Sequence, residues 1–160
     1  MGGAVYAGGD GKEGTMNVSE ILGSKGSEVI TAGPDLSLVE AIRMLVGAGV
    51  GCLVIVDRRR VVGILTERDI LRENARHFDK LAQTRIADIM TEDVIIGFPD
   101  DDVDYLMGLM TAKRIRHVPI LSHGQLAGLV SIGDVVKAKV RHAEVEIRHL
   151  TDYITGKYPG

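Results

Sequence analysis

GILTERDI (Gly63–Ile70) and GLVSIGDV (Gly128–Val135) share one pattern: a glycine and two apolar residues lead to a hydroxyl residue, and an aspartate follows three positions later. The two aspartates, Asp69 and Asp134, are 65 positions apart. The same offset aligns all of residues 27–72 with residues 92–137 without a gap. The chain therefore contains an internal repeat.

The repeat continues upstream with a change of register. VSEIL (Val18–Leu22) matches IADIM (Ile86–Met90) at an offset of 68, so the first copy has three more residues than the second between this segment and the main block. GSKGS (Gly23–Ser27) has the composition of a loop. We expect the extra residues to lie in a loop there.

Each copy has the pattern of a β-α-β-β-α unit. A short apolar run (residues 28–31 and 93–96) is followed by Pro-Asp, which suits the first turn of a helix. Apolar residues recur at helical spacing over residues 36–50 and 101–115. Two β-rich runs then surround a polar turn, over residues 52–65 and 117–130, and TERD or SIGD opens a second helix.

A unit of about 55 residues with a three-stranded sheet has too small a core to be stable alone. We therefore expect an α/β (α+β) fold in which two β-α-β-β-α repeats pack face to face about a pseudo-twofold axis. This arrangement would create two similar clefts between the repeats.

The composition excludes several classes of protein. The net charge of −3 gives no basic field for a nucleic-acid backbone, and no apolar run reaches the roughly 18 residues that span a bilayer. The single cysteine, Cys52, cannot form an internal disulfide, and the N-terminus has no apolar signal-peptide core. We expect a cytoplasmic protein without nucleic-acid or membrane partners. The Gly-rich residues 1–15 are predicted to be a disordered leader.

Thr66 and Asp69, like Ser131 and Asp134, fit two roles. A hydroxyl at the N-cap with an acid three residues later forms a capping box, which stabilises a helix by about 1 kcal/mol. The same pair can bind a ligand, because one carboxylate accepts hydrogen bonds from both ribose hydroxyls and a helix N-terminus favours phosphate. The glycine three residues before each hydroxyl would let a flat ligand approach the backbone.

The doubled β-α-β-β-α plan, the Pro-Asp pairs, the GILTERDI and GLVSIGDVVK phrases and the IRHVPI strand resemble tandem cystathionine-β-synthase (CBS) domains, the pair often called a Bateman module. The resemblance covers about residues 16–140. It implies CBS domain 1 over residues 16–78, CBS domain 2 over residues 79–140, and a C-terminal helical extension and tail over residues 141–160.

In that family the hydroxyl and the aspartate of this motif hold the ribose of adenosine-containing ligands. The resemblance therefore implies that Thr66 and Asp69 lie in one cleft, and that Ser131 and Asp134 lie in the other.

The resemblance also places residues for the rest of a nucleotide near the interface between the repeats. Arg68, Arg116 and His117 differ between the copies and are the candidates for phosphate contacts. The alternatives are a solvated first-turn position for Arg68 and a backbone-satisfied strand position for His117. Arg114 is assigned to the C-terminal carbonyls of its helix. The adenine candidates, each of which also suits a core strand, are Thr31, Gly51, Cys52, Ile95 and Pro119.

After Asp134 the sequence predicts a helix that continues to about Ile154, with Thr155-Gly156 as its end. Its apolar residues follow a 3-4 stepping: Val140, Ala143, Ile147, Leu150 and Ile154. We expect this face to pack on a second subunit in a homodimer. Packing back on its own repeats is the alternative.

The predicted function is that of an adenine-nucleotide-binding regulatory module. AMP, ATP or NAD(H) would bind between the repeats and report energy or redox state to an unidentified protein target. The chain has no GxSxG, HExxH or CxxC motif, and no predicted strand precedes the glycines of residues 9–14, which have the GxGxxG spacing, so we expect no catalysis, no catalytic cofactor and no metal. Asp100-Asp101-Asp102 is interpreted as a charge cluster at a helix start. The alternative is a ligand-free interaction or dimerisation module of the same fold.

Overall fold

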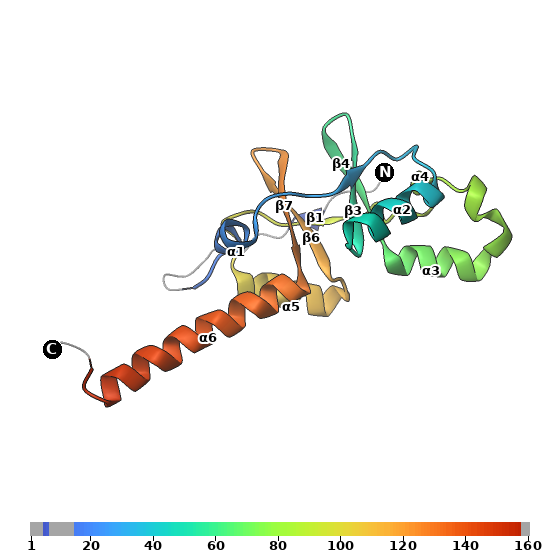
Figure 1. The fold of residues 1–160 in the computed structure, drawn as a ribbon. Coiled ribbons are helices and arrows are strands. Elements are labelled where there is room, and N and C mark those ends of the chain that lie inside the picture. The colour runs from blue at the N-terminus through green and yellow to red at the C-terminus, as the bar shows by residue number, and fades with distance from the viewer. Residues whose placement is uncertain (1–4, 7–14, 158–160) are drawn as a thin grey trace.

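The computed structural model describes residues 5–6 and 15–157 and shows three small sheets with helices around them (Figure 1). The first repeat forms β2 (Thr31–Ala32), α2 (Leu38–Ala48), β3 (Cys52–Asp57), β4 (Arg60–Thr66) and α3 (Glu67–Arg76). The second forms β5 (Ile95–Ile96), α5 (Val103–Lys113), β6 (His117–Ser122), β7 (Gln125–Ser131) and α6 (Ile132–Ile154). The connecting elements are α1 (Val18–Lys25), the 3-10 helix η1 (Phe78–Gln83) and α4 (Ile86–Ile89). The α+β fold and the β-α-β-β-α order are confirmed.

The two hairpins are equivalent residue by residue. β3 and β4, like β6 and β7, pair antiparallel, and a register irregularity follows Ile55 in one hairpin and Ile120 in the other. β2 runs parallel to β3, and Gly97, directly after β5, bridges Ile120 in the same parallel sense. The sequence repeat is therefore also a structural repeat, including the irregularities of its sheets.

The two repeats share an apolar core between their sheets. Cys52 and Ile64 of the first repeat pack with Val94 and Ile96 of the second, and all four are buried. Burial, with a smaller contribution from the negative charge of Asp69, raises the pKa of the Cys52 thiol to about 12. Cys52 is thus a packing residue, as its sequence context indicates.

The short helices that precede the repeats are exchanged between them. Val18 and Ile21 of α1 belong to the core of the second repeat, and Ile86 of α4 belongs to the core of the first. The domain boundary predicted between residues 78 and 79 stays a prediction. Each folded unit, however, includes a helix from the other side of that boundary.

The Pro-Asp pairs do not start helices, contrary to the prediction. α2 starts after the N-cap Ser37, which forms a capping box with Glu40, and α5 starts after the N-cap Asp102. The N–H of Tyr105 donates to Asp102 and is the main cause that lowers the pKa of that carboxyl. Asp102 therefore caps a helix, as the charge-cluster interpretation expects.

The Pro-Asp pairs lie in turns that serve the exchanged helices. The N–H of Ala87 in α4 donates to the carbonyl oxygen of Pro34 (2.9 Å), and the N–H of Ser19 in α1 donates to that of Pro99 (2.8 Å). The first N–H groups of a helix have no partner within the helix, and these turns provide the acceptors. The Pro-Asp pairs therefore form turns whose carbonyl groups accept hydrogen bonds from the N-terminus of an exchanged helix.

The segment Gly23–Ser27 is only partly a loop. α1 continues through Lys25 and ends at Gly26, whose φ of 92° is in the left-handed region that favours glycine. The three extra residues of the first copy thus lengthen a helix. This corrects the expectation that they form a loop.

The N-terminal segment is also not wholly disordered. Val5–Tyr6 forms strand β1, which pairs in parallel with β5, and the Tyr6 ring stacks on Phe98 with a centroid separation of 5.8 Å. The prediction of a disordered leader is wrong for these two residues. Residues 1–4 and 7–14 lie outside the described residues.

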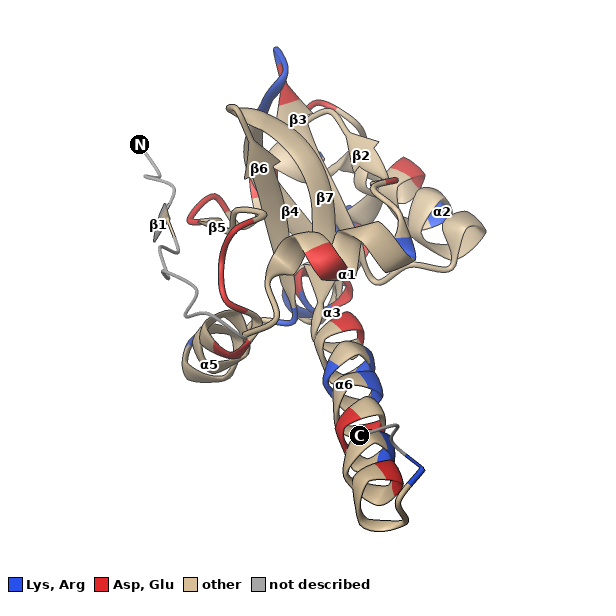
Figure 2. Ribbon diagram, turned by 90° about the vertical axis from the view of Figure 1, so that its left-hand side faces the viewer, with Lys and Arg blue, Asp and Glu red and all other residues tan. Residues whose placement is uncertain are grey.

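α6 extends away from the body of the molecule (Figures 1 and 2). It ends at Ile154, with Thr155 as C-cap and Gly156 at a φ of 69°, so its predicted length and its end are confirmed. Ile147 is 64% exposed and Leu150 is 62% exposed. The start of the helix packs on the second repeat through Val135, but its C-terminal half does not pack back on the repeats, which contradicts that alternative.

Candidate functional site

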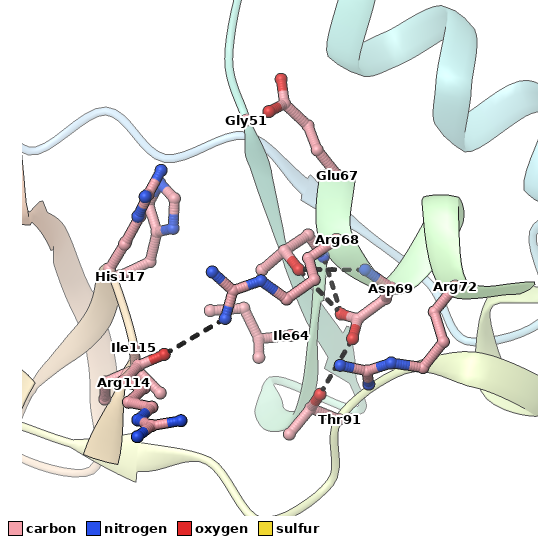
Figure 3. A pocket seen from close by; sticks show the side chains of 12 residues that line it. Gly51, Ile64, Glu67, Arg68, Asp69, Arg72, Thr91, Arg114, Ile115 and His117 are labelled. Atoms are coloured by element: carbon pink, nitrogen blue, oxygen red, sulfur yellow. Dashed lines mark hydrogen bonds between the residues drawn. The ribbon is translucent and has the colours of Figure 1, made fainter. Parts of the chain in front are cut away.

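A cleft of about 250 Å³ lies between the two repeats (Figure 3). The first repeat contributes the end of β4 and the first turns of α3, and the second contributes the segment that leads from α5 into β6. The volume is near the lower end of the range for small-molecule sites. Six of the residues predicted from the sequence line it: Gly51, Thr66, Arg68, Asp69, Arg116 and His117.

Thr66 and Asp69 form the predicted capping box at the start of α3. Oδ2 of Asp69 accepts hydrogen bonds from the N–H (2.9 Å) and the hydroxyl (3.1 Å) of Thr66. Oδ1 accepts a long hydrogen bond (3.4 Å) from the hydroxyl of Thr91, which also lines the cleft. The carboxylate thus caps α3 mainly through Oδ2, and its other oxygen has the longer contact.

Four arginines from the two repeats line the same cleft as this carboxylate. Arg68 and Arg72 lie one turn apart on α3, and Arg114 and Arg116 lie beside the start of β6. Arg68 crosses the cleft, and its Nη1 donates to the carbonyl oxygen of Arg114 (3.4 Å; Figure 3). Arg68 thus contacts the second repeat, although its side chain is exposed, so the phosphate role and the solvated alternative both stay predictions. With Glu67 and Asp69 as the lining acids, the cleft carries an excess of positive charge.

His117 is half-buried on the opposite side of the cleft from α3 (Figure 3). Burial lowers the pKa of His117 from its ordinary value of 6.5, although the nearby carboxylates of Asp134 and Glu67 act in the opposite direction. The ring is therefore neutral at pH 7. It offers an N–H donor and no positive charge at that pH.

Four of the five adenine candidates do not line this cleft. Cys52 faces the core between the sheets, and Pro119 is buried, with its carbonyl oxygen accepting from the N–H of Gly97 (2.9 Å). Ile95 is buried and lies opposite Val5 of β1, whereas Thr31 is exposed on β2 and pairs with Val54. These four candidates therefore stay predictions outside this cleft, because alternate residues of a strand point to opposite faces and spacing alone does not identify the face that meets a cleft.

Ser131 and Asp134 form the equivalent capping box at the start of α6. Oδ2 of Asp134 accepts from the N–H of Ser131 (2.8 Å) and from Nζ of Lys25 (2.5 Å), the last residue of α1. Burial alone would raise the pKa of Asp134, but the hydrogen bonds from Lys25 and Ser131 outweigh it and hold the pKa below its usual value. This carboxylate is therefore ionised and already has a cation as partner.

The repeated glycines have a different role from the one predicted. A Cβ on Gly63 would lie 2.6 Å from Sδ of Met90, and a Cβ on Gly128 would lie 2.6 Å from Cδ2 of Leu22. Gly63 makes room for Met90, the last residue of the IADIM segment. Gly128 makes room for Leu22, the last residue of the VSEIL segment. The expectation that they admit a flat ligand is therefore wrong.

Sequence analysis does not identify Arg72, Thr91 or Lys25, and it assigns Arg114 to its own helix end. Arg72 follows Asp69 by three positions, so helical periodicity could have placed it on the same face. Thr91 and Lys25 belong to connecting segments, and no local pattern indicates their contacts with Asp69 and Asp134.

Two absences apply to the described part of the chain. Across residues 5–6 and 15–157, no three His, Cys, Asp or Glu side chains come together in a group that could hold a metal ion. No helix in these ranges is both long and apolar enough to cross a membrane.

Comparisons with known proteins place this geometry in context. The family model described as "CBS domain" matches the chain twice, over residues 18–76 and 86–141. A mitochondrial CBS domain-containing protein of Arabidopsis thaliana is 36% identical over 153 residues, which cover 90% of this chain and 74% of the relative. The crystal structure of a CBS-domain-containing protein of Agrobacterium tumefaciens is 40% identical with a TM-score of 0.75, covering 78% of this chain and 99% of that one.

A further solved structure carries ligands. It is a CBS domain pair in complex with 5′-methylthioadenosine and S-adenosyl-L-methionine, 28% identical to this chain with a TM-score of 0.71. The alignment covers 80% of this chain and 98% of that one.

Proposed function

The chain belongs to the CBS-domain family as a pair of CBS domains, and from this premise we propose that the cleft at Thr66 and Asp69 binds an adenine nucleotide. The observation that carries the proposal is the meeting of a helix-start carboxylate from one repeat with arginines from both repeats in a single cleft. A carboxylate suits a vicinal diol and guanidinium groups suit phosphate, so the two halves of a nucleotide have complementary partners.

In this proposal each part of the ligand has a named partner. Asp69 accepts from the ribose hydroxyls, while Arg68, Arg116 and His117 hold phosphate. The related CBS domain pair solved with two adenosine-containing ligands supports the adenosine part. The arginines favour phosphate-bearing ligands, AMP, ATP or NAD(H), over neutral nucleosides.

We propose regulation without catalysis as the outcome of binding. Arg68 spans the two repeats, so a phosphate that draws Arg68 away from the Arg114 carbonyl favours one relative arrangement of the repeats over another. A homodimer that uses the exposed face of α6 would transmit this change to a protein target. The cytoplasmic location stays a prediction, and the Arabidopsis relative is named as mitochondrial.

The test is calorimetric titration of the protein with AMP, ATP, NAD, NADH and 5′-methylthioadenosine. Asp69→Asn is expected to weaken nucleotide binding about 10- to 150-fold, because a charge-assisted ribose contact worth about 1.5–3 kcal/mol is lost. Asp104→Asn is the matched control, since this acid is exposed on α5 and pairs with Lys139 outside the cleft.

A second variant separates the phosphate contacts from the ribose contacts. Arg116→Ala should weaken AMP and ATP more than it weakens 5′-methylthioadenosine, which has no phosphate. If none of these compounds binds to the wild-type protein, the ligand-free interaction module is the better account.

A further inference from the structure

We propose that Lys25 is an internal counter-ion that closes the second nucleotide site, so that each chain carries one high-affinity nucleotide, at Asp69. This inference rests on the proposed function and deepens it by assigning the number of ligands and the residue that determines it. Four features of the structure support it.

The first feature is the pair of contacts that Lys25 makes. Its Nζ lies 2.5 Å from Oδ2 of Asp134 and 2.7 Å from the carbonyl oxygen of Leu129. Oδ2 of Asp134 also accepts from the N–H of Ser131, so this oxygen already has two donors. Oδ2 of Asp69 also has two donors, but both are neutral groups of Thr66, whereas a ligand at Asp134 would have to displace an ammonium group.

The second feature is the difference between the equivalent positions of the two repeats. Ile64 corresponds to Leu129, and its carbonyl oxygen accepts from the backbone N–H of Thr91 (2.9 Å). The hydroxyl of Thr91 makes the long contact with Asp69. The ammonium group of Lys25 in the second repeat therefore takes the place of the N–H and the hydroxyl of Thr91 in the first. The donors in direct contact with Asp69 are thus neutral, whereas Asp134 is in direct contact with a cation.

The third feature is the origin of Lys25 in the sequence. The first copy has three more residues than the second between the exchanged helix and the main block of the repeat, and these residues extend α1 to Lys25. α4, which lacks them, has four residues and ends at Ile89. The insertion thus provides the additional helical turn that brings a cation to Asp134.

The fourth feature is the lack of arginines at the second site. The positions equivalent to Arg114 and Arg116 are Gly49 and Gly51, the position equivalent to Arg68 is Gly133, and only Arg72 has a basic equivalent, Lys137. The phosphate contacts of the first cleft therefore have no equivalents at these positions. Even with Lys25 displaced, phosphate would bind more weakly there.

The experiment counts ligands per chain with NAD and AMP as probes, by calorimetry and by native mass spectrometry. Wild-type protein is expected to bind one equivalent with high affinity. Lys25→Met removes the ammonium group and keeps the length of the side chain, and it should add a second equivalent by lowering the second dissociation constant at least tenfold. In that background, Asp134→Asn should remove the added equivalent.

Two controls test whether the charge of Lys25 is the cause. Lys25→Arg keeps a cation at the end of α1 and should retain one equivalent. Lys139→Met breaks the ion pair with Asp104 (2.6 Å), which lies away from the second site, and should also leave one equivalent. Circular dichroism of each variant checks that the fold is unchanged.

The outcomes separate this inference from the proposed function. One equivalent for both wild type and Lys25→Met, or two for both, overturns the role of Lys25 and keeps nucleotide binding. None for wild type and one for Lys25→Met supports the role of Lys25 and overturns binding at Asp69. None for either protein overturns both.

Discussion

Asp69 and Asp134 hold equivalent positions at the start of equivalent helices, and their surroundings differ in charge. Asp69 has hydroxyl and amide donors, whereas Asp134 has an ammonium group at 2.5 Å. Because the capping geometry is the same at both, the difference comes from the segments that approach each carboxylate. At the scale of single residues, binding capacity thus depends on neighbours distant in the sequence.

His117 gives a pH-dependent prediction at this scale. Burial lowers its pKa below 6.5, so the free protein carries a neutral ring at pH 7. A bound phosphate favours the imidazolium and raises this pKa, so binding takes up a proton and affinity increases as pH falls from 7.5 to 5.5. The increase is at most about tenfold for each pH unit.

The measurement is the dissociation constant of NAD as a function of pH, because the phosphates of NAD stay ionised over this range. His117→Asn should bind with an affinity that is nearly independent of pH. An equal pH dependence in wild type and variant would show that His117 does not contact phosphate.

At the scale of elements, the exchange of α1 and α4 joins the two repeats into one unit. Each exchanged segment ends in a large side chain, Leu22 or Met90, that packs over a glycine of the opposite hairpin. Each helix also donates backbone N–H groups to a turn that follows a first strand. Neither repeat therefore completes its own core.

Gly63→Ala tests this packing. The new Cβ would meet Sδ of Met90 at 2.6 Å and the carbonyl oxygen of Thr91 at 3.2 Å, so the free energy of unfolding should fall by about 1–3 kcal/mol. Denaturant unfolding followed by circular dichroism measures this change.

Gly47→Ala is the matched control for this variant. Gly47 lies inside α2 with nothing within 4 Å of an added Cβ, so alanine should stabilise the protein by about 0.5–1 kcal/mol. Equal effects of the two substitutions would contradict the proposed contact between Gly63 and Met90.

At the scale of the whole molecule, the C-terminal half of α6 is a feature that the described part of the chain leaves uncovered. Val140, Ile147, Leu150 and Ile154 are each at least half exposed, and Figure 2 shows charged residues of both signs along the same helix. An apolar stripe of this length on a helix is typical of an interface between subunits. We therefore keep the prediction that a second copy of the chain packs against it.

The double variant Ile147→Glu with Leu150→Glu tests the dimer. Because both side chains are exposed in the single chain, the fold should change in stability by no more than about 0.5 kcal/mol. Light scattering after size-exclusion chromatography should show a change from dimer to monomer. Arg148→Glu, outside the apolar stripe, should leave the dimer intact, and an unchanged mass for the double variant would contradict the prediction.

The sequence by itself determined the repeat, the order of the elements, the two capping boxes and the end of α6. These features depend on local spacing, since helix caps, strand alternation and turn residues act within a few positions of the chain. The resemblance to the family, rather than local spacing, implied that Thr66, Asp69, Arg68, Arg116 and His117 lie near the interface between the repeats. Local spacing had a further limit. It misinterpreted the Pro-Asp pairs and the glycines, because their partners lie on another helix.

Only the tertiary structure decided which residues meet across the repeats. The contacts of Thr91 with Asp69 and of Lys25 with Asp134 join residues 22 and 109 positions apart. The choice of Gly51 over Cys52 as a cleft residue follows from which strand face the shared core covers. Such contacts depend on how the repeats pack against each other. The two repeats have similar sequences, so the sequence does not show that packing gives Asp69 and Asp134 different partners.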